Sequence, residues 1–231
     1  MNNSLSQRGF TLIEMAIVLV ILGLLLGGVL APLSARQEQD RRDKNAERLE
    51  QAREALIGYA IVNGYLPCPD TDKDRKPGSG QENRPCPSNT FNAGRLPWAT
   101  LGIDGEYDAW GAPHQIYYAV NGAFTDKTSL FNLGTTSTAA QTINIYNTAA
   151  SCGSSPPTNL VAMDVPALIW STAKTDYAAQ GRVDEKENTN ADSCYVFRAF
   201  STINGQEFDD QMVWLSRSIL FDRMIQAGKL P

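Results

Sequence analysis

Histidine is almost absent from the 231-residue chain, which carries only His114. A metal site built on two histidines is therefore excluded, and every histidine-dependent mechanism would need this one residue. The four cysteines form no Cys-x-x-Cys pair, which argues against a zinc ribbon or a thioredoxin-type redox site. No GxxxxGK[ST] or GxGxxG phosphate-binding loop occurs. We therefore expect a protein that is not an enzyme.

Positive charge is also scarce, because 20 Lys and Arg residues stand against 25 Asp and Glu, for a formal net charge of −5. This balance excludes a generally basic surface for nucleic acid, and no stripe of aromatic and basic residues suits single-stranded DNA. We expect no nucleic-acid partner. Hydrophobic residues make up 42% of the chain, which argues against disorder throughout.

Charged side chains are missing altogether from residues 15–35. As a helix this run is roughly 30 Å long, about the thickness of the hydrocarbon core of a bilayer. Gly23 and Gly27 form a small-xxx-small pair on one face, which favours close helix packing. Pro32 lacks an N–H and is expected to bend or loosen the helix locally. The run is longer than the apolar region of an ordinary signal peptide.

A carboxylate, Glu14, lies inside the beginning of the apolar segment, in the sequence Arg8-Gly9-Phe10-Thr11-Leu12-Ile13-Glu14. An unpaired charge in hydrocarbon costs several kcal/mol, so an acid within a membrane usually has a partner and a function. The alternative is that Glu14 sits at the level of the lipid headgroups and remains solvated.

The motif RGFTLIE at residues 8–14, followed by a long apolar run, resembles the processing signal of type IV prepilins and type II secretion pseudopilins. The resemblance implies cleavage after Gly9 and N-methylation of Phe10 by a prepilin peptidase/N-methyltransferase, with this chain as substrate. It also implies that Glu14 meets the new α-amino group of Phe10 on a neighbouring subunit. Opposite charges attract far more strongly in an apolar medium than in water.

Four segments are predicted: a leader at 1–9, a transmembrane and assembly helix at 10–33, an amphipathic stalk helix at 34–63 and a globular head at 64–231. The stalk should pack on the head through an apolar stripe at helical spacing, formed by Ala46, Leu49, Ala52, Leu56, Tyr59 and Ala60. Asn63-Gly64 is expected to end the helix.

The head contains short runs rich in aromatic and β-branched residues, which predict strands at 115–120, 142–146, 167–172, 194–200 and 211–215. The Asn-Gly pairs at 121–122 and 204–205 are typical of hairpin turns. Ser216 is expected to cap a final helix that runs to Gly228. The predicted fold class is α+β, with a long N-terminal helix packed on an antiparallel sheet.

Two polar segments, 147–160 and 180–193, are expected to be surface insertions. The motifs GYLPCPD at 64–70, GRLPWATLG at 94–102, DAWG at 108–111 and the sequence at 208–231 resemble minor pilin-like and pseudopilin-like proteins. This extends the resemblance to most of the chain. We interpret these motifs as structural.

The four cysteines would lie in an oxidising compartment if the head is exported. Three pairings are possible, and we favour Cys68–Cys86 and Cys152–Cys194 because each closes a polar loop onto the edge of an element. Free structural cysteines are the alternative.

Within the first of these loops, Asp70, Asp72 and Asp74 alternate as at the start of a calcium-binding loop. Arg75 occupies the position where such a loop needs glycine. The competing interpretation is a solvated acidic loop closed by a disulfide, and no other cofactor is expected.

The sequence therefore predicts a minor pilin or pseudopilin, a structural subunit of a type IV pilus or a type II secretion-like filament. Its partners would be the prepilin peptidase, other pilin or pseudopilin subunits and the bacterial inner membrane, which it would cross once with a periplasmic head before assembly. Two alternatives stay open: a binding module or adhesin at a filament tip, and a simple membrane-anchored periplasmic protein.

Overall fold

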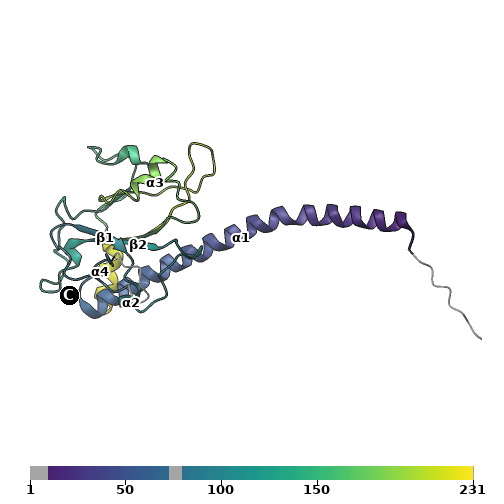
Figure 1. Ribbon diagram of the computed structural model, residues 1–231. Helices are drawn as coiled ribbons and strands as arrows, with labels where there is room; N and C mark the ends of the chain where they lie inside the picture. Colours follow the sequence, from purple (N-terminus) through teal and green to yellow (C-terminus); the bar gives the residue numbers. More distant parts are fainter. Residues whose placement is uncertain (1–9, 73–79, 231) are drawn as a thin grey trace, which may run out of the picture. The chain divides into compact units, whose positions relative to one another are not determined.

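The computed structural model describes residues 10–72 and 80–230, except for the side chains of residues 25–32. The chain divides into two compact units, Met1–Arg42 and Asp43–Pro231. The first helix, α1 (Leu12–Asn63), begins in one unit and ends in the other (Figure 1). Its helical assignment continues through Gly23, Gly27 and Pro32, so the proline does not end the helix. Among the residues that the structure describes, no helix is both long enough and apolar enough to span a membrane.

The second unit is built on a four-stranded antiparallel sheet with the strand order β1-β2-β5-β7. Its strands are β1 (Phe91–Arg95), β2 (Ile116–Asn121), β5 (Ala167–Ser171) and β7 (Gln211–Leu215). β5 and β7 lie within the predicted ranges, and β2 runs one residue past its predicted end at Val120. The α+β class predicted from the sequence is thereby confirmed, with a helix packed on an antiparallel sheet.

One face of this sheet packs on the C-terminal part of α1. Leu49, Ala52, Leu56 and Ala60 are buried there, as the apolar stripe predicts. They share a core with residues of β2, β5, β7 and the last helix, among them Tyr118, Val120, Ile169, Leu215 and Leu220. Ala46 is exposed, which corrects the predicted stripe, and the wholly buried residue at this level is its neighbour Asn45.

The predicted start of the final helix agrees with the structure, and its last residue is Gln226, two residues before the predicted end at Gly228. Helix α4 (Arg217–Gln226) begins after Ser216, whose side chain accepts a hydrogen bond from the Ile219 N–H at 3.3 Å. Gly228 follows the helix with a φ of 67°, a conformation that glycine adopts without strain. In the same way, Gly64 follows α1 with a φ of 82°.

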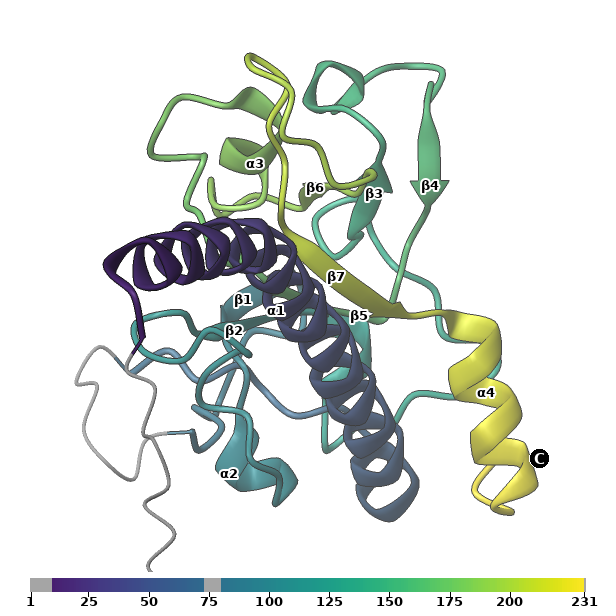
Figure 2. The ribbon, with the colours of Figure 1, turned by 90° about the vertical axis from the view of Figure 1, so that its right-hand side faces the viewer.

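A second sheet of three strands lies above the first in Figure 2, with the order β4-β3-β6. It comprises β3 (Asn144–Tyr146), β4 (Leu160–Ala162) and β6 (Cys194–Val196), and β3 pairs with β6 in parallel. The sequence analysis expected one antiparallel sheet, and the strand predicted at 194–200 ends at Val196 instead. A second core fills the space between the sheets, with Ile145, Leu168, Trp170, Tyr195 and Met212 among its members.

Short helices complete the second unit: α2 (Trp98–Leu101), η1 (Gly122–Phe124), η2 (Ala149–Ser151) and α3 (Val183–Glu187). The last two lie in the segments predicted as surface insertions.

The hairpin predicted at Asn121-Gly122 is wrong. Asn121 ends β2 and caps η1, because its side chain accepts a hydrogen bond from the Ala123 N–H at 3.0 Å. Asn204-Gly205 forms a turn inside a loop closed by the bridge between Ser201 and Phe208. It does not join paired strands, since β6 and β7 belong to different sheets.

Candidate functional site

The N-terminal end of α1 carries a reciprocal cap formed by Thr11 and Glu14. Thr11 donates hydrogen bonds from its N–H and its hydroxyl to Oε2 of Glu14, both at 2.9 Å. The Glu14 N–H donates in return to Oγ1 of Thr11 at 3.3 Å. This is a capping box, in which two residues three apart satisfy each other's backbone groups at the start of a helix. The sequence analysis missed it, although Thr-x-x-Glu is its usual signature.

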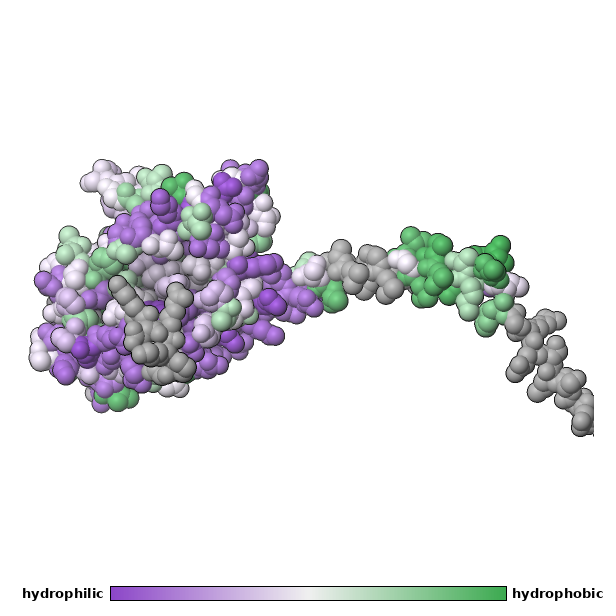
Figure 3. Space-filling model, in the orientation of Figure 1, coloured by the Kyte–Doolittle hydropathy of each residue, from purple (hydrophilic) through white to green (hydrophobic). Residues whose placement is uncertain are grey.

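The residues on either side of the predicted cleavage bond are only partly described. Gly9 lies outside the described residues, and the Phe10 side chain is 79% exposed. The first turns of α1 expose apolar side chains on every face, including Leu12, Ile13, Leu19 and Leu24. Figure 3 shows green, hydrophobic surface along this end of the helix. An exposed apolar surface of this kind marks a membrane or protein contact. Gly23 lies within it, and the side chains of Gly27 and Pro32 are outside the described ones.

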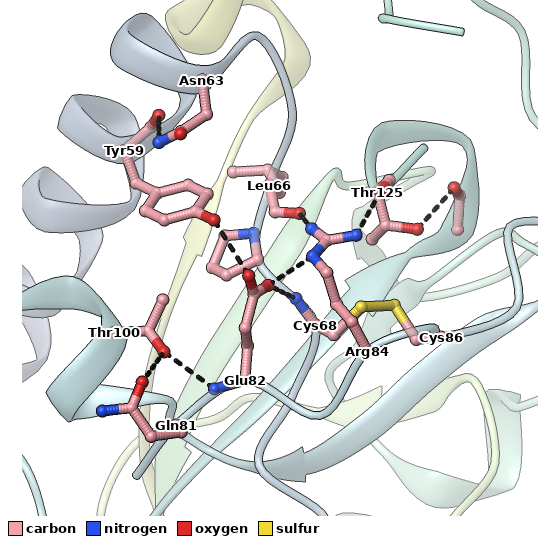
Figure 4. A network of polar contacts seen from close by, with 12 residues as sticks. Tyr59, Asn63, Leu66, Cys68, Gln81, Glu82, Arg84, Cys86, Thr100 and Thr125 are labelled. Atoms are coloured by element: carbon pink, nitrogen blue, oxygen red, sulfur yellow. Dashed lines mark hydrogen bonds and ion pairs between the residues drawn. A yellow bond between two sulfur atoms is a disulfide. The ribbon is translucent and has the colours of Figure 1, made fainter. Parts of the chain in front are cut away.

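A polar network in the second unit joins the end of α1 to the loop closed by Cys68–Cys86 (Figure 4). Glu82 is its centre. The Glu82 carboxylate accepts hydrogen bonds from the Cys68 N–H at 3.0 Å and the Tyr59 hydroxyl at 3.1 Å. It also forms an ion pair with Arg84 at 2.8 Å.

Arg84 extends the network by donating hydrogen bonds to the carbonyl oxygens of Leu66 at 3.1 Å and Thr125 at 3.0 Å. Its guanidinium lies 4.4 Å from the centre of the Tyr65 ring. Burial raises the pKa of Tyr59, with Tyr65 and Glu82 adding to the effect, so the phenol stays neutral. The network therefore acts as a structural clamp on the end of α1.

Two of the three predicted calcium ligands, Asp70 and Asp72, form polar contacts with other residues of the chain. Asp70 is buried and pairs with Arg95 at 3.2 Å, and its other oxygen accepts the Gly80 N–H at 2.7 Å. Asp72 accepts a hydrogen bond from Asn83 at 3.0 Å. Asp74 lies outside the described residues. An arginine partner already neutralises Asp70, which lowers its value as a metal ligand.

Three other carboxylates come together where α3 meets the segment before β7. Glu185, Asp209 and Asp210 are all buried, and one oxygen of each lies within 4.8 Å of the others. Burial raises the pKa of Glu185 to about 7, and burial likewise raises the pKa of Asp210. Such a cluster can share protons or accept a hard cation. The sequence analysis missed it, because Glu185 is distant in sequence from the Asp-Asp pair.

The remaining candidates serve the fold. The structure contains the two favoured disulfides, Cys68–Cys86 and Cys152–Cys194. In the DAWG turn, buried Asp108 accepts hydrogen bonds from the Ser171 hydroxyl at 2.6 Å and the Trp110 N–H at 2.9 Å. The backbone N–H of His114 closes the same turn by bonding the Gly111 carbonyl.

The chain matches one family signature and is similar to pseudopilin-type proteins of known name. A family signature described as "Prokaryotic N-terminal methylation motif" matches residues 4–30. Type II secretion system core protein G of Pectobacterium carotovorum subsp. carotovorum is 30% identical over 131 residues, which cover 55% of this chain and 76% of that protein. The protein of the same name from Klebsiella michiganensis is 30% identical over 114 residues, covering 48% and 73%. No solved structure matches the chain.

Proposed function

The chain belongs to the family of the type II secretion system core protein G, and from this premise we propose that it is a pseudopilin, a structural subunit of a type II secretion-like filament. The observation that carries the proposal is the coincidence of the methylation motif at residues 4–30 with an exposed apolar helix start. Such a helix gains stability when its apolar surface is buried against lipid or against other helices.

Processing comes first in the proposed mechanism. A prepilin peptidase cleaves after Gly9, removes the leader at 1–9 and methylates Phe10. The mature chain then consists of an assembly helix at 10–33, a stalk at 34–63 and a head at 64–231. The helix anchors the subunit in the inner membrane once, with the head in the periplasm, until the subunit enters a filament.

Assembly depends on Glu14 in this account. In the single chain its carboxylate accepts hydrogen bonds from Thr11, so its acceptor oxygen already faces the first turn of the helix. An incoming α-amino group from Phe10 of a neighbouring subunit would add a charge-assisted partner at that position. The apolar surface around Gly23 and Gly27 would then pack against neighbouring helices.

The polar groups of the head support a structural role rather than an enzymatic one. Glu82 is committed to Tyr59, Cys68 and Arg84, and Asp108 is committed to Ser171 and the turn that follows it. We therefore propose that the chain is a substrate of the processing enzyme and not itself an enzyme.

The test separates the charge of Glu14 from its role in the cap. Glu14→Gln keeps an acceptor oxygen for Thr11 but removes the charge, whereas Glu14→Ala removes both. We expect mass spectrometry to find cleaved, N-methylated Phe10 in both variants, and both to be depleted from sheared filaments. If Glu14→Gln assembles like the parent chain, the charge is not needed and the proposed mechanism fails.

A further inference from the structure

Asparagine is followed by glycine at three places in the sequence, 63–64, 121–122 and 204–205. Such a pair can lose the asparagine amide without an enzyme, because glycine has no side chain to hinder its backbone nitrogen as it approaches the asparagine side chain. Asparagine is for this reason among the thermolabile residues. The structure places the three pairs in different surroundings, which decide whether the reacting groups can meet.

The pair at 121–122 is held on every side. Asn121 is wholly buried, and its side-chain nitrogen donates hydrogen bonds to Oγ of Ser137 at 2.8 Å and to Oδ1 of Asp164 at 3.0 Å. Its side-chain oxygen accepts the Ala123 N–H at 3.0 Å. Gly122 is enclosed as well, since a Cβ there would lie 2.1 Å from a carbonyl oxygen. The amide of Asn121 therefore cannot turn toward the Gly122 nitrogen without breaking these contacts.

The pair at 63–64 is held by the last turn of α1. The Asn63 side-chain amide donates to the Tyr59 carbonyl oxygen at 2.9 Å, and the Gly64 N–H donates to the Ala60 carbonyl oxygen at 2.7 Å. Both reacting groups are thus engaged with helical backbone. They can meet only when the end of the helix opens, which makes this pair slower to react than an unrestrained one.

The pair at 204–205 lies in the loop between β6 and β7, which projects at the top of Figure 2. The Gln206 N–H donates to the Ile203 carbonyl oxygen at 2.8 Å, so Asn204 and Gly205 are the two central residues of a β-turn. Both are exposed, and no described residue forms a hydrogen bond with the Asn204 side chain. A Cβ at Gly205 would have no heavy atom within 4 Å. The approach of the two reacting groups is therefore unobstructed.

The nearest ionised group to this turn is Glu207, which pairs with Arg182 at 2.7 Å. Its own backbone N–H first, and then Arg182 and the Gly205 N–H, hold the pKa of Glu207 below its usual value. The Gly205 N–H thus lies beside a carboxylate that Arg182 already neutralises. This contact does not involve the Asn204 side chain.

We propose that Asn204 is a site of spontaneous deamidation, for which the chain supplies its own nucleophile. A hydroxide ion takes the proton from the Gly205 nitrogen, which then attacks Cγ of Asn204. The bond from Cγ to Nδ2 breaks, and the nitrogen takes up a proton from water and leaves as ammonia. One water molecule then opens the five-membered succinimide ring at either carbonyl, which gives aspartate or isoaspartate. The balance is one water consumed and one ammonia released.

The product differs from the parent chain in charge and in backbone. A carboxylate appears beside Ile203, whose side chain is 65% exposed at the same loop tip. In the isoaspartate product the main chain gains a methylene group, which shifts the Ile203 carbonyl against the Gln206 N–H. Because the reaction does not reverse, its extent increases with the age of the chain. This modification goes beyond the proposed structural role and does not depend on filament assembly.

The test follows all three pairs in one sample. The full chain is incubated in detergent at pH 8, then reduced and digested with trypsin, which places the pairs in separate peptides, 54–73, 96–127 and 199–217. Mass spectrometry measures the fraction of each asparagine converted to the acid, with the sample taken at time zero as the blank. A parallel sample is unfolded in urea, so that the three pairs react without the fold.

We expect Asn204 in the folded chain to react within about threefold of its rate in urea, and Asn121 to react at least about tenfold more slowly folded than unfolded. Asn204 should yield two products of equal mass, aspartate and isoaspartate. Protection of Asn204 equal to that of Asn121 overturns the inference. Aspartate as the single product would contradict the ring intermediate.

A variant ties the reaction to this turn. Asn204→Gln keeps a neutral amide but places it one carbon further from the backbone, so the five-membered ring cannot form. Ion-exchange chromatography of the intact chain should resolve an acidic species that grows with time in the parent and is absent from Asn204→Gln. Asn190→Gln, at an exposed asparagine followed by alanine, is the control and should behave like the parent. Circular dichroism verifies that both variants are folded. An acidic species that grows equally in Asn204→Gln would refute the site.

Discussion

The side-chain amide of Asn45 on α1 donates a hydrogen bond to the Gln211 side chain on β7 at 2.7 Å, across 166 residues of sequence. The carbonyl oxygen of the same amide accepts the Ala109 N–H at 3.3 Å. One buried side chain therefore joins the helix, the last strand and the DAWG turn. Arg48, one turn further along the helix, donates to the carbonyl oxygens of Tyr107 and Asp108 at 3.0 and 2.6 Å.

Replacing Asn45 with alanine should destabilise the second unit, because the Ala109 N–H and the Gln211 side chain lose a partner. We expect the free energy of unfolding in urea to fall by about 1–3 kcal/mol. Ala46→Ser, at the exposed neighbouring position, is the control and should stay within about 0.5 kcal/mol of the parent chain. Equal stability of the two variants would show that the amide is not an anchor.

Gly122→Ala should be strongly destabilising. A Cβ at this position would lie 2.1 Å from the Thr90 carbonyl oxygen and 2.7 Å from that of Ser88, and backbone atoms cannot swing away as a long side chain can. We expect a loss of more than about 2 kcal/mol in the same urea experiment. Gly58→Ala is the opposite case, with no heavy atom within 4 Å of its Cβ in the interior of α1. It should gain about 0.5–1 kcal/mol.

The carboxylate cluster predicts a stability that falls as the pH rises. The pKa of Glu185 is raised to about 7 from a value of 4.5, so the folded state holds a proton that the unfolded state releases. The stabilisation is complete below pH 4.5 and is lost as the pH rises through 7. The free energy of unfolding, measured with a chelator present, should therefore decrease between pH 5 and pH 8 by on the order of 1–3 kcal/mol.

Glu185→Gln should reduce the slope of this pH profile, of which buried Asp210 keeps a part, and make the chain more stable than the parent at pH 8. Asp222→Asn, at an exposed carboxylate on α4, should leave the slope intact. Repeating the titration with calcium chloride tells whether a cation can replace the proton, because a bound cation would raise stability at pH 8 alone. A parent profile that is flat in chelator would contradict the prediction.

The two disulfides should contribute unequally. Cys152 and Cys194 are 42 residues apart and Cys68 and Cys86 are 18 apart. In the chain-entropy account, replacing the first pair with serines costs about 4 kcal/mol and replacing the second about 3 kcal/mol. Thermal unfolding of the two double variants gives the comparison, and a larger loss for the shorter loop would instead point to the Glu82 clamp that it anchors.

Strands rich in aromatic and β-branched residues could be predicted from the sequence. Strands that form mainly because an adjacent strand pairs with them could not. β2 and β5 are rich in tyrosine, isoleucine and tryptophan, whereas β1 reads Phe-Asn-Ala-Gly-Arg, a sequence with little strand preference. β1 forms because β2 offers it an unpaired edge and because Arg95 also pairs with Asp70 on its other side. The parallel pairing of β3 with β6 has no local signal either, since it joins segments about fifty residues apart.

The candidate sites show the same division. The Thr11 and Glu14 cap lies within four consecutive residues, so its signature was available in the sequence. The carboxylates of Glu185, Asp209 and Asp210 come from segments that only the fold brings together. Their chemistry depends on burial and mutual distance, which composition and spacing do not report.

The strands of the two sheets alternate along the chain. β5 of the first sheet lies in sequence between β4 and β6 of the second, and β6 in turn lies between β5 and β7. The second sheet is therefore no appendage that a single deletion or a single protease nick could detach. A deletion that removed the second sheet would also have to remove or reconnect β5, the strand that pairs with both β2 and β7. We therefore expect the two sheets to fold and unfold together.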